Sequence, residues 1–364
     1  MSISLKNIHK SFKTHKVLDN VSFDVATGET VVLFGPSGAG KTVLLRLIAG
    51  VVDPDEGSIF LNGEDMAGVE PEDRGLGMAF QNFALFPHMD AAENIAAPLT
   101  ARRHGKDKIR EAVGNLARLL KIDHVTSHKP KELSNGQKQR TALARALAGD
   151  PSILLLDDPL RNVDAKLRFE MRLELPRLLR ERNATVIYVT QDYKEAMALG
   201  DRIAVLDTKG ITQIGTPEDI YCRPATVEIA RLFGDPVINL LEVTPEKMAT
   251  GAIETRLSGG RLVLPQSLAA HAGQSLLLGL RPESIRFVAS DTPGAIPIII
   301  EAETPLNEKT VSLAVTERGR EIMLSRPAGT HAPDRGPAHV AVDANAVLLF
   351  DPQTGRRVEL EVGQ

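Results

Sequence analysis

The sequence predicts an α/β domain with a parallel sheet core, followed by an all-β domain. Three runs of consecutive apolar residues, TVVLF (30–34), ILLLD (153–157) and TVIYV (185–189), are typical of strands buried on both faces of a parallel sheet. Helix-like segments alternate with these runs, as in α/β folds. The last third of the chain instead contains short β-like runs separated by Gly, Pro and Asp, which favours a small β-barrel. The predicted domains are therefore 1–235 and 236–364.

The composition is that of an ordinary globular chain long enough for two domains. Of its 364 residues, 43% are hydrophobic and 25% are charged. The formal net charge of −4 provides no general basic field, which argues against nucleic acid as a partner. The single cysteine, Cys222, excludes an internal disulfide and fits a reducing cytosol. No run resembles a signal peptide or a membrane-spanning helix, so any role at a membrane is expected to be that of a peripheral partner.

The N-terminal region predicts an antiparallel strand pair that leads into the parallel sheet. Residues 3–8 and 17–25 alternate apolar and polar side chains, and VLDNVSFDV is the clearer example. The strand at 30–34 is followed at once by a glycine-rich turn and a helix-like run that ends at Gly50. Residues 87–150 contain the amphipathic run KIREAVGNLARLLK. We therefore expect a helical subdomain at about 87–150.

The glycine-rich turn after the strand at 30–34 predicts a phosphate site. The pattern G-x-x-x-x-G-K-[ST] is matched by Gly35, Pro36, Ser37, Gly38, Ala39, Gly40, Lys41 and Thr42. Glycines allow backbone N–H groups to turn toward phosphate oxygens, and the N-terminus of the following helix adds partial positive charge. We expect Lys41 to reach the β- and γ-phosphates of ATP and the Thr42 hydroxyl to bind Mg²⁺. Asp157, at the end of a buried strand, is the expected second magnesium anchor.

A second motif narrows this phosphate-binding chain to one family. LSNGQ, at 133–137, lies about twenty residues before Asp157. With these motifs in this order, the chain resembles the ATP-binding subunits of ABC transporters, and the resemblance extends over essentially the whole chain. In that family the signature binds the γ-phosphate of the ATP held by another subunit, so that two cassettes enclose two ATP molecules. The resemblance therefore implies ATP contacts for Ser134, Asn135, Gly136 and Gln137.

Further positions match the same family pattern. Phe12 corresponds to the aromatic residue that stacks on adenine, with a place in the core as the alternative. Gln81 matches the Q-loop glutamine that contacts Mg²⁺, and Asp164, within RNVDAK, matches the D-loop aspartate. The segment after Gln81 is similar to the surface that docks the coupling helix of a membrane subunit. Its candidate contact residues, for which core packing is the alternative role, are Phe83, Phe86 and Met89.

Two longer stretches resemble one branch of the family. ITQIGTPEDIYCRPAT (211–226) and GLRPESIRF (279–287) look like the ATPases that import sugars, polyols and glycerol phosphates. Those proteins carry a C-terminal oligonucleotide-fold-like (TOBE) domain, so 236–364 is expected to be a regulatory and dimer-contact module. The resemblance implies a peripheral protein at the cytoplasmic face of the inner membrane. Its expected partners are two transmembrane permease subunits, a second ATPase subunit and, indirectly, a periplasmic or extracellular solute-binding protein.

The positions that carry the chemistry depart from the family. The family places a glutamate after the Walker B aspartate as general base, whereas this chain has Asp158, whose side chain is shorter by ~1.3 Å. Misplacement on that scale costs on the order of 100-fold in rate. The family's switch histidine is replaced by Gln191, which can donate a hydrogen bond but carries no charge. Arg161 replaces the D-loop serine, and Asn135 replaces the central glycine of the signature.

These departures favour an asymmetric pair of ATPase subunits. The chain's own site, with Lys41, Asp158 and Gln191 as its catalytic positions, is expected to bind MgATP and to hydrolyse it slowly. Its LSNGQ signature is expected to serve a second ATPase subunit whose glutamate and histidine are intact. Two alternatives stay open: a symmetric homodimeric importer ATPase with slow turnover, and an ATP-binding regulatory protein without transport. ABC proteins that act on nucleic acid carry two cassettes in one chain or long coiled coils, and this chain has neither.

Overall fold

The chain forms two compact units in the computed structural model, which describes residues 2–257, 259–330, 333 and 335–358. The first unit extends to Pro217, and the second begins at Glu218. This division precedes the predicted boundary near 236, because helix α8 (Val227–Leu232) packs with the strands that follow it. Its buried Val227 and Ala230 share a hydrophobic cluster with Phe350. The placement of α8 in the second unit depends on contacts with residues far along the chain, which the local amino-acid composition does not indicate.

A six-stranded sheet in the order β10-β9-β3-β8-β7-β6 forms the centre of the first unit. Five of its strands are parallel, and only β10 pairs antiparallel to its neighbour. The three predicted buried runs form β3, β8 and β7, and none of their residues is exposed. This confirms the predicted parallel core. The strands are β3 (Thr30–Phe34), β6 (Leu76–Ala79), β7 (Ile153–Asp157), β8 (Thr185–Thr190), β9 (Arg202–Asp207) and β10 (Gly210–Gly215).

A second, antiparallel sheet in the order β2-β1-β4-β5 covers one side of helix α1 (Lys41–Ile48). Its strands are β1 (Ile3–Phe12), β2 (His15–Val25), β4 (Glu56–Leu61) and β5 (Glu64–Asp65). Four fully buried side chains of α1, from Leu44 to Ile48, share one hydrophobic core with both sheets. Each buried side chain of this size contributes about 1.5–3 kcal/mol relative to an exposed one. Burial of α1 between two sheets therefore fixes the phosphate-binding loop that precedes it.

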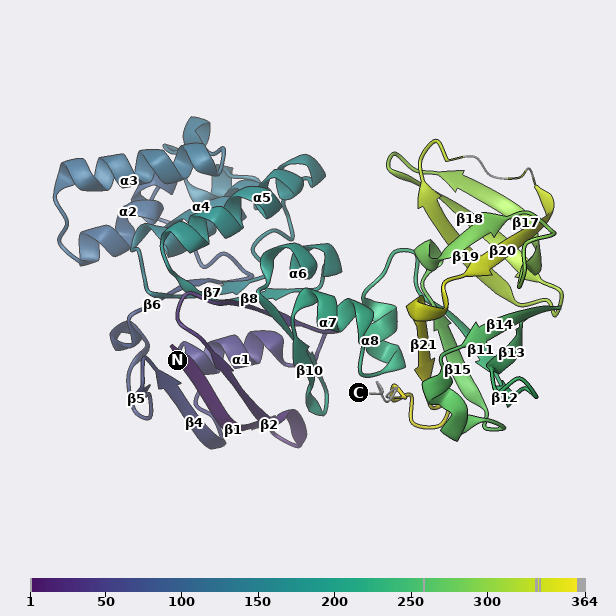
Figure 1. Ribbon diagram of the computed structural model, residues 1–364. Helices are drawn as coiled ribbons and strands as arrows, with labels where there is room; N and C mark the ends of the chain where they lie inside the picture. The colour runs from purple at the N-terminus through teal and green to yellow at the C-terminus, as the bar shows by residue number, and fades with distance from the viewer. Residues whose placement is uncertain (1, 258, 331–332, 334, 359–364) are drawn as a thin grey trace. The chain divides into compact units, whose positions relative to one another are not determined.

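Five helices lie on the other side of the six-stranded sheet (Figure 1). They are α2 (Ala91–Ala101), α3 (Lys106–Leu119), α4 (Asn135–Ala148), α5 (Ala165–Glu181) and α6 (Tyr193–Leu199). The first three contact one another and lie within residues 87–150. The remaining short elements of this unit are 3-10 turns at Pro71–Arg74, Asp123–Val125 and Pro130–Glu132. Among the described residues, no helix combines the length and the apolar content needed to cross a membrane.

The second unit is built mainly of strands, as predicted. Helix α7 (Pro217–Cys222) and α8 precede three antiparallel sheets, in the orders β11-β15-β21, β12-β13-β14 and β16-β20-β17-β18-β19. The strands alternate buried and exposed residues, so one face of each sheet packs inward. Their bounds are β11 (Asn239–Val243), β12 (Glu246–Lys247), β13 (Ile253–Leu257), β14 (Gly260–Leu264), β15 (Leu276–Leu280), β16 (Ile285–Val288), β17 (Ile296–Pro305), β18 (Lys309–Thr316), β19 (Glu321–Pro327), β20 (Gly336–Val342) and β21 (Val347–Phe350).

Arg281, within the GLRPESIRF stretch, joins α7 and α8 to the strands of the second unit. Its guanidinium donates to the carbonyl oxygens of Ala230 (3.0 Å), Tyr221 (2.8 Å) and Phe233. It also lies 3.9 Å from the centroid of the Tyr221 ring. The last carbonyls of a helix lack partners within the helix, so Arg281 satisfies groups at the end of α8 that would otherwise be buried and unpaired. The arginine of the GLRPESIRF stretch therefore has a structural role: it attaches α7 and α8 to β15.

We expect Arg281→Ala to lower the free energy of unfolding of the second unit by about 3 kcal/mol, because several buried carbonyls lose their donor at once. Denaturant unfolding monitored by circular dichroism measures the change. The matched control is Arg318→Ala, since Arg318 is exposed and its loss is expected to cost less than about 0.5 kcal/mol. Equal losses for the two variants would contradict the assignment.

Candidate functional site

Three loops meet at one edge of the six-stranded sheet because their strands are parallel and in register. Phe34, the last residue of β3, pairs with Thr190 of β8, and Asp157 of β7 pairs with Val189 of β8. The carboxyl ends of parallel strands lie at the same edge, where open α/β sheets bind their ligands. The glycine-rich loop, the aspartate pair at 157–158 and Gln191 are therefore neighbours, although they are far apart in the sequence.

A cavity of ≈ 300 Å³ lies between these loops. Its lining includes half of the predicted site residues: Ser37, Gly38, Gly40, Lys41, Thr42, Gln81, Asp157, Asp158 and Gln191, together with Val17, Val43, Arg161 and Val189. Gly40 has a left-handed backbone (φ 91°), and a Cβ there would lie 2.7 Å from Leu18 Cδ2. The loop thus needs glycine at this position both for its turn and for its close approach to β2.

Lys41 is the first residue of α1, and its ammonium group lies under the loop. Nζ donates to the carbonyl oxygens of Gly35 and Pro36, both at 2.7 Å. Burial lowers the pKa of Lys41, and the nearby carboxylates of Asp158 and Asp157 oppose this shift. An ammonium group has three donors, so Lys41 can bind an anion in the cavity while it retains contacts with the loop. This geometry suits the predicted phosphate contact.

Thr42 and Asp157 form the oxygen-rich side of the cavity. The Thr42 hydroxyl donates to Asp157 Oδ1 at 3.1 Å, and Asp157 is only 2% exposed. Burial raises the pKa of Asp157, whereas the hydrogen bond from Thr42 lowers it. A hydroxyl and a carboxylate are the hard oxygen donors that Mg²⁺ prefers, and Gln81, whose side chain carries an amide carbonyl, lines the same cavity. The donor set therefore fits the predicted metal.

Asp158 lies in a strained turn that is anchored on several sides. Its φ of 51° is left-handed, which is uncommon for a residue other than glycine. Its N–H donates to the carbonyl of Val189 (3.0 Å), and its carbonyl accepts Nε2 of Gln139 (2.5 Å). Burial raises the pKa of the Asp158 carboxyl, and the nearby Arg161 guanidinium opposes that shift. The turn therefore holds the Asp158 carboxyl at the cavity, 3.7 Å from Arg161 Nη1.

Gln139 belongs to the site, although its position two residues after the signature motif gave no sequence signal. This glutamine is 3% exposed, and its Oε1 accepts the Asn162 N–H at 2.8 Å while its amide donates to Asp158. A single buried side chain on α4 thus joins the turn at 158 to the D-loop. Nearby, a Cβ on Gly136 would lie 2.9 Å from the Asn162 carbonyl, which explains the signature glycine by close packing.

The signature residues lie at the N-terminus of α4. Ser134 is the N-cap: its hydroxyl accepts the Gln137 N–H at 3.3 Å, and its own N–H donates to Gln137 Oε1 at 2.9 Å. Asn135 and Gly136 occupy the first turn of the helix. In the part of the chain that the structure describes, none of these four residues lines the cavity with the glycine-rich loop. The structure therefore does not bring the signature to this chain's own phosphate site.

Gln191 follows β8 and contacts the glycine-rich loop directly. Its Oε1 accepts the Ser37 hydroxyl at 3.2 Å. The segment after Gln191 is fixed by Asp192, whose N–H donates to Thr190 Oγ1 (3.0 Å) and whose carboxylate accepts the Lys194 N–H (2.8 Å). The switch position is thus held between the loop at 35–42 and the start of α6.

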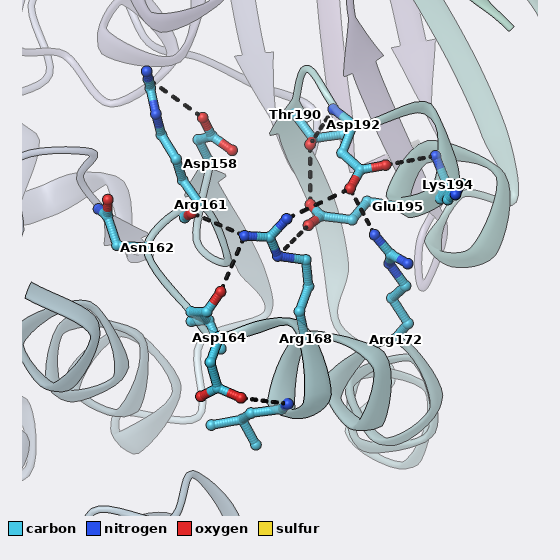
Figure 2. Close-up of polar contacts among 12 residues, drawn as sticks. Asp158, Arg161, Asn162, Asp164, Arg168, Arg172, Thr190, Asp192, Lys194 and Glu195 are labelled. Carbon is cyan, nitrogen blue, oxygen red and sulfur yellow. Dashed lines mark hydrogen bonds and ion pairs between the residues drawn. The ribbon is translucent and has the colours of Figure 1, made fainter. Parts of the chain in front are cut away.

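Two arginines on the first turns of α5 connect the D-loop to this switch segment (Figure 2). Arg168 Nη2 donates to the carbonyls of Arg161 and Val163, both at 3.0 Å, and Arg168 Nη1 lies 3.9 Å from Asp192 Oδ2. Arg172 Nη2 contacts the same Asp192 oxygen at 2.6 Å. The predicted D-loop residue Asp164 is the N-cap of α5. One helix therefore positions both segments relative to each other.

Glu195 forms the buried end of this cluster. It is 2% exposed, and its Oε2 accepts hydrogen bonds from Tyr188 and Thr190, each at 2.9 Å. Burial raises the pKa of Glu195, which these two hydrogen bonds oppose. Sequence reasoning missed Glu195, Arg168 and Arg172, because their partners lie outside their own helices, where helical spacing gives no indication of a contact. A glutamate at a helical position that faces the sheet is the signal that would have indicated a buried network.

Phe12 lies at the end of β1 and is 46% exposed, with Lys10 Nζ 5.5 Å from its ring centroid. This exposure is inconsistent with the alternative role in the core. Phe12 does not appear among the described residues that line the cavity, so the adenine contact stays a prediction.

The candidate docking segment presents one clearly exposed aromatic residue. Phe86 is 43% exposed and lies under the Arg145 guanidinium, 5.4 Å from the ring centroid, whereas Phe83 and Met89 are half-buried. The segment is held by the buried Asn94, whose side chain accepts the Phe86 N–H at 2.8 Å. It is therefore an ordered surface, with Phe86 as its most accessible apolar group.

Comparisons with known proteins agree with this geometry. The family model described as ABC transporter matches residues 18–161. The chain is 40% identical over 356 residues to the sn-glycerol-3-phosphate import ATP-binding protein UgpC of Cereibacter sphaeroides, covering 98% of this chain and 99% of that protein. The protein with the same description from Escherichia coli (strain K12) is 40% identical over 366 residues, with the same coverage. A solved dimeric ATP-binding cassette in a post-hydrolysis state, bound to ADP and Pi, has a TM-score of 0.56 and 30% identity; it covers 59% of this chain and 98% of that one.

We expect Asp157→Asn to raise the melting temperature of the ligand-free protein at pH 7. The pKa of this carboxyl is raised in the folded state, so its ionisation costs stability as the pH rises above the ordinary value near 3.8. Asparagine removes the charge and retains an oxygen acceptor for Thr42. Differential scanning calorimetry from pH 4 to pH 8 checks the effect, which should increase with pH. A decrease in melting temperature across this range would contradict the burial argument.

Proposed function

Because this chain belongs to the ABC transporter family, as an ATP-binding subunit of the sugar and glycerol-phosphate importers, we propose that its own nucleotide site is the weak half of an asymmetric pair. ATP hydrolysis coupled to transport is the activity of this family. In the proposed arrangement the chain binds MgATP at the cavity beside Lys41. Its signature motif completes a second site, on another ATPase subunit, which carries most of the turnover.

The residues that line the cavity have the chemistry that nucleotide and metal binding require. The N-terminus of α1 and the loop N–H groups receive the phosphates, and Lys41 adds a positive charge from below the loop. Thr42 and Asp157, together with Gln81, would hold Mg²⁺, which neutralises charge on the β- and γ-phosphates when bound. Lys41 and the N-terminus of α1 thus bind the phosphates, whereas hydrolysis depends on other residues, Asp158 and Gln191.

The state of the two catalytic side chains is the observation that carries the proposal. Asp158 faces the Arg161 guanidinium at 3.7 Å, and the oxygen of Gln191 is engaged by the Ser37 hydroxyl at 3.2 Å. A general base must accept a proton from the attacking water, and the Asp158 side chain is shorter than that of glutamate. Gln191 cannot carry the positive charge of a histidine. Both differences act on hydrolysis, whereas the binding residues are retained.

The position of the signature supports the second half of the proposal. Ser134 and Gln137 cap α4 away from the cavity of their own chain, and their N–H groups are used in the capping box. The donors proposed for a nucleotide on another chain are therefore the Ser134 hydroxyl proton and the N–H groups of Asn135 and Gly136 in the first turn. The solved cassette to which this chain is similar is dimeric and contains ADP and Pi. A second subunit with glutamate and histidine in place would receive a complete site from this arrangement.

The proposed partners follow from the importer relatives. Two transmembrane permease subunits would dock at the ordered surface around Phe86, and through them the chain would act at the cytoplasmic face of the inner membrane. The solute is proposed to be a sugar, polyol or glycerol-type compound delivered by a solute-binding protein, since the relatives import sn-glycerol 3-phosphate. The C-terminal β region would act as a regulatory and dimer-contact module.

The direct test is the ATPase rate of the purified chain alone at saturating MgATP. We expect this rate to be about 100-fold below that of the assembled transporter, because the shortened base alone costs on this order. MgATP binding, measured in parallel by calorimetry, should remain in the micromolar range. Robust turnover by the isolated chain would favour the symmetric homodimer instead.

A gain-of-function variant tests whether residues 158 and 191 are what limits ATP hydrolysis at this chain's own site. Asp158→Glu combined with Gln191→His restores the length of the base and the titratable switch residue, so hydrolysis is expected to rise at least tenfold. The matched control, Lys41→Ala in the same background, should abolish the gain because phosphate binding is lost. If the double variant binds MgATP and its rate does not increase, the defect lies elsewhere.

A further inference from the structure

The nucleotide cavity contains a second cation that the family pattern does not supply. Among the described residues that line this cavity, the cationic side chains are Lys41 and Arg161. Lys41 is buried and already donates to two carbonyls of the loop. Arg161 comes from the D-loop, and its side chain is 53% exposed. The two positive groups therefore approach the cavity from different elements.

The backbone of Arg161 is fixed even though its side chain is accessible. Its N–H donates to the Asp158 carbonyl at 3.3 Å, and its carbonyl accepts Nη2 of Arg168 at 3.0 Å. Gln139 holds both the preceding turn and the following residue, Asn162. Figure 2 shows the Arg161 side chain extending from this anchored segment toward Asp158. The position from which the guanidinium reaches into the cavity is thus set by the Asp158 carbonyl and by two side chains, the buried Gln139 and the half-buried Arg168.

The contact between Arg161 and Asp158 is weak enough to exchange. The nearest nitrogen and oxygen atoms are 3.7 Å apart, which is longer than a charge-assisted hydrogen bond. Because the arginine is half-exposed, such a pair contributes at most about 1 kcal/mol. A phosphate group offers a guanidinium two parallel hydrogen bonds and more negative charge than a carboxylate. A phosphate that enters the cavity would therefore compete well for this side chain.

We propose that Arg161 binds the γ-phosphate of ATP in this chain's own site, by leaving Asp158 and turning toward the terminal phosphate, and so makes the site selective for ATP over ADP. This inference rests on the proposed nucleotide site at Lys41. Gln191 is neutral and its side-chain oxygen is engaged by Ser37, so Arg161 is the lining cation besides Lys41 that can hold the terminal phosphate. ADP ends at the β-phosphate, which the loop and Lys41 already bind. Lys41 is expected to contact both the β- and the γ-phosphate, so Arg161 would be the lining cation that contacts the γ-phosphate alone.

Calorimetric titration of the full chain with MgADP and with the non-hydrolysable MgAMP-PNP tests this assignment. Arg161→Ser should weaken MgAMP-PNP binding about tenfold and change MgADP binding by less than about twofold, because one charged contact to the terminal phosphate is lost. Arg161→Lys should fall between, since a lysine retains the charge without the paired donors. The matched control, Arg110→Ser, removes an exposed arginine paired with Asp107 on α3 and should leave both affinities unchanged.

These titrations distinguish failure of the Arg161 assignment from failure of the proposed nucleotide site. Equal weakening of both nucleotides by Arg161→Ser, or no weakening of either, would overturn the role of Arg161 while leaving nucleotide binding intact. Failure of the wild-type chain to bind either nucleotide would instead overturn the proposed function. Thermal unfolding of Arg161→Ser checks the fold, and the exposed side chain predicts a change in stability within about 0.5 kcal/mol.

Discussion

The register of three parallel strands is the constraint on which the site depends. Because β3, β8 and β7 are paired so that Phe34 lies beside Thr190 and Asp157 beside Val189, the loops that follow them reach one cavity. A shift of one residue would turn alternate side chains to the opposite face of the sheet. The fully buried residues of these strands make such a shift costly. The core of the domain thus fixes the geometry of its chemistry.

A second layer of order comes from polar side chains that are not part of any motif. Gln139 on α4 and Arg168 on α5 bind backbone groups of the turn at 158 and of the D-loop. Glu195 and Asp192 present carboxylates to the arginines of α5 on the other side. The switch segment, the base and the D-loop are therefore positioned by one network. A nucleotide that displaces Arg161 would act on a side chain whose own backbone does not need to move.

The parts of this structure that the sequence predicts are those dictated by local chemistry. A phosphate loop needs glycines and a lysine at fixed spacing, and buried parallel strands need continuous apolar runs, so both were predictable. The pairing of Asp158 with Arg161 was not, because it depends on a left-handed turn that no residue type requires. Gln139 and Glu195 form hydrogen bonds with residues outside their own helices, which no local sequence pattern indicates. The division of the chain at Pro217 depends on the packing of α8 and likewise has no local sequence pattern.

Asymmetry between two nucleotide sites is the central claim, and subunit-specific inactivation in the assembled transporter tests it most directly. Asp158→Asn damages only this chain's own site, whereas Ser134→Arg blocks the signature that this chain offers to another subunit. ATP turnover should survive Asp158→Asn largely unchanged and should fall at least 100-fold with Ser134→Arg. Loss of turnover with Asp158→Asn, or its survival with Ser134→Arg, would contradict the account.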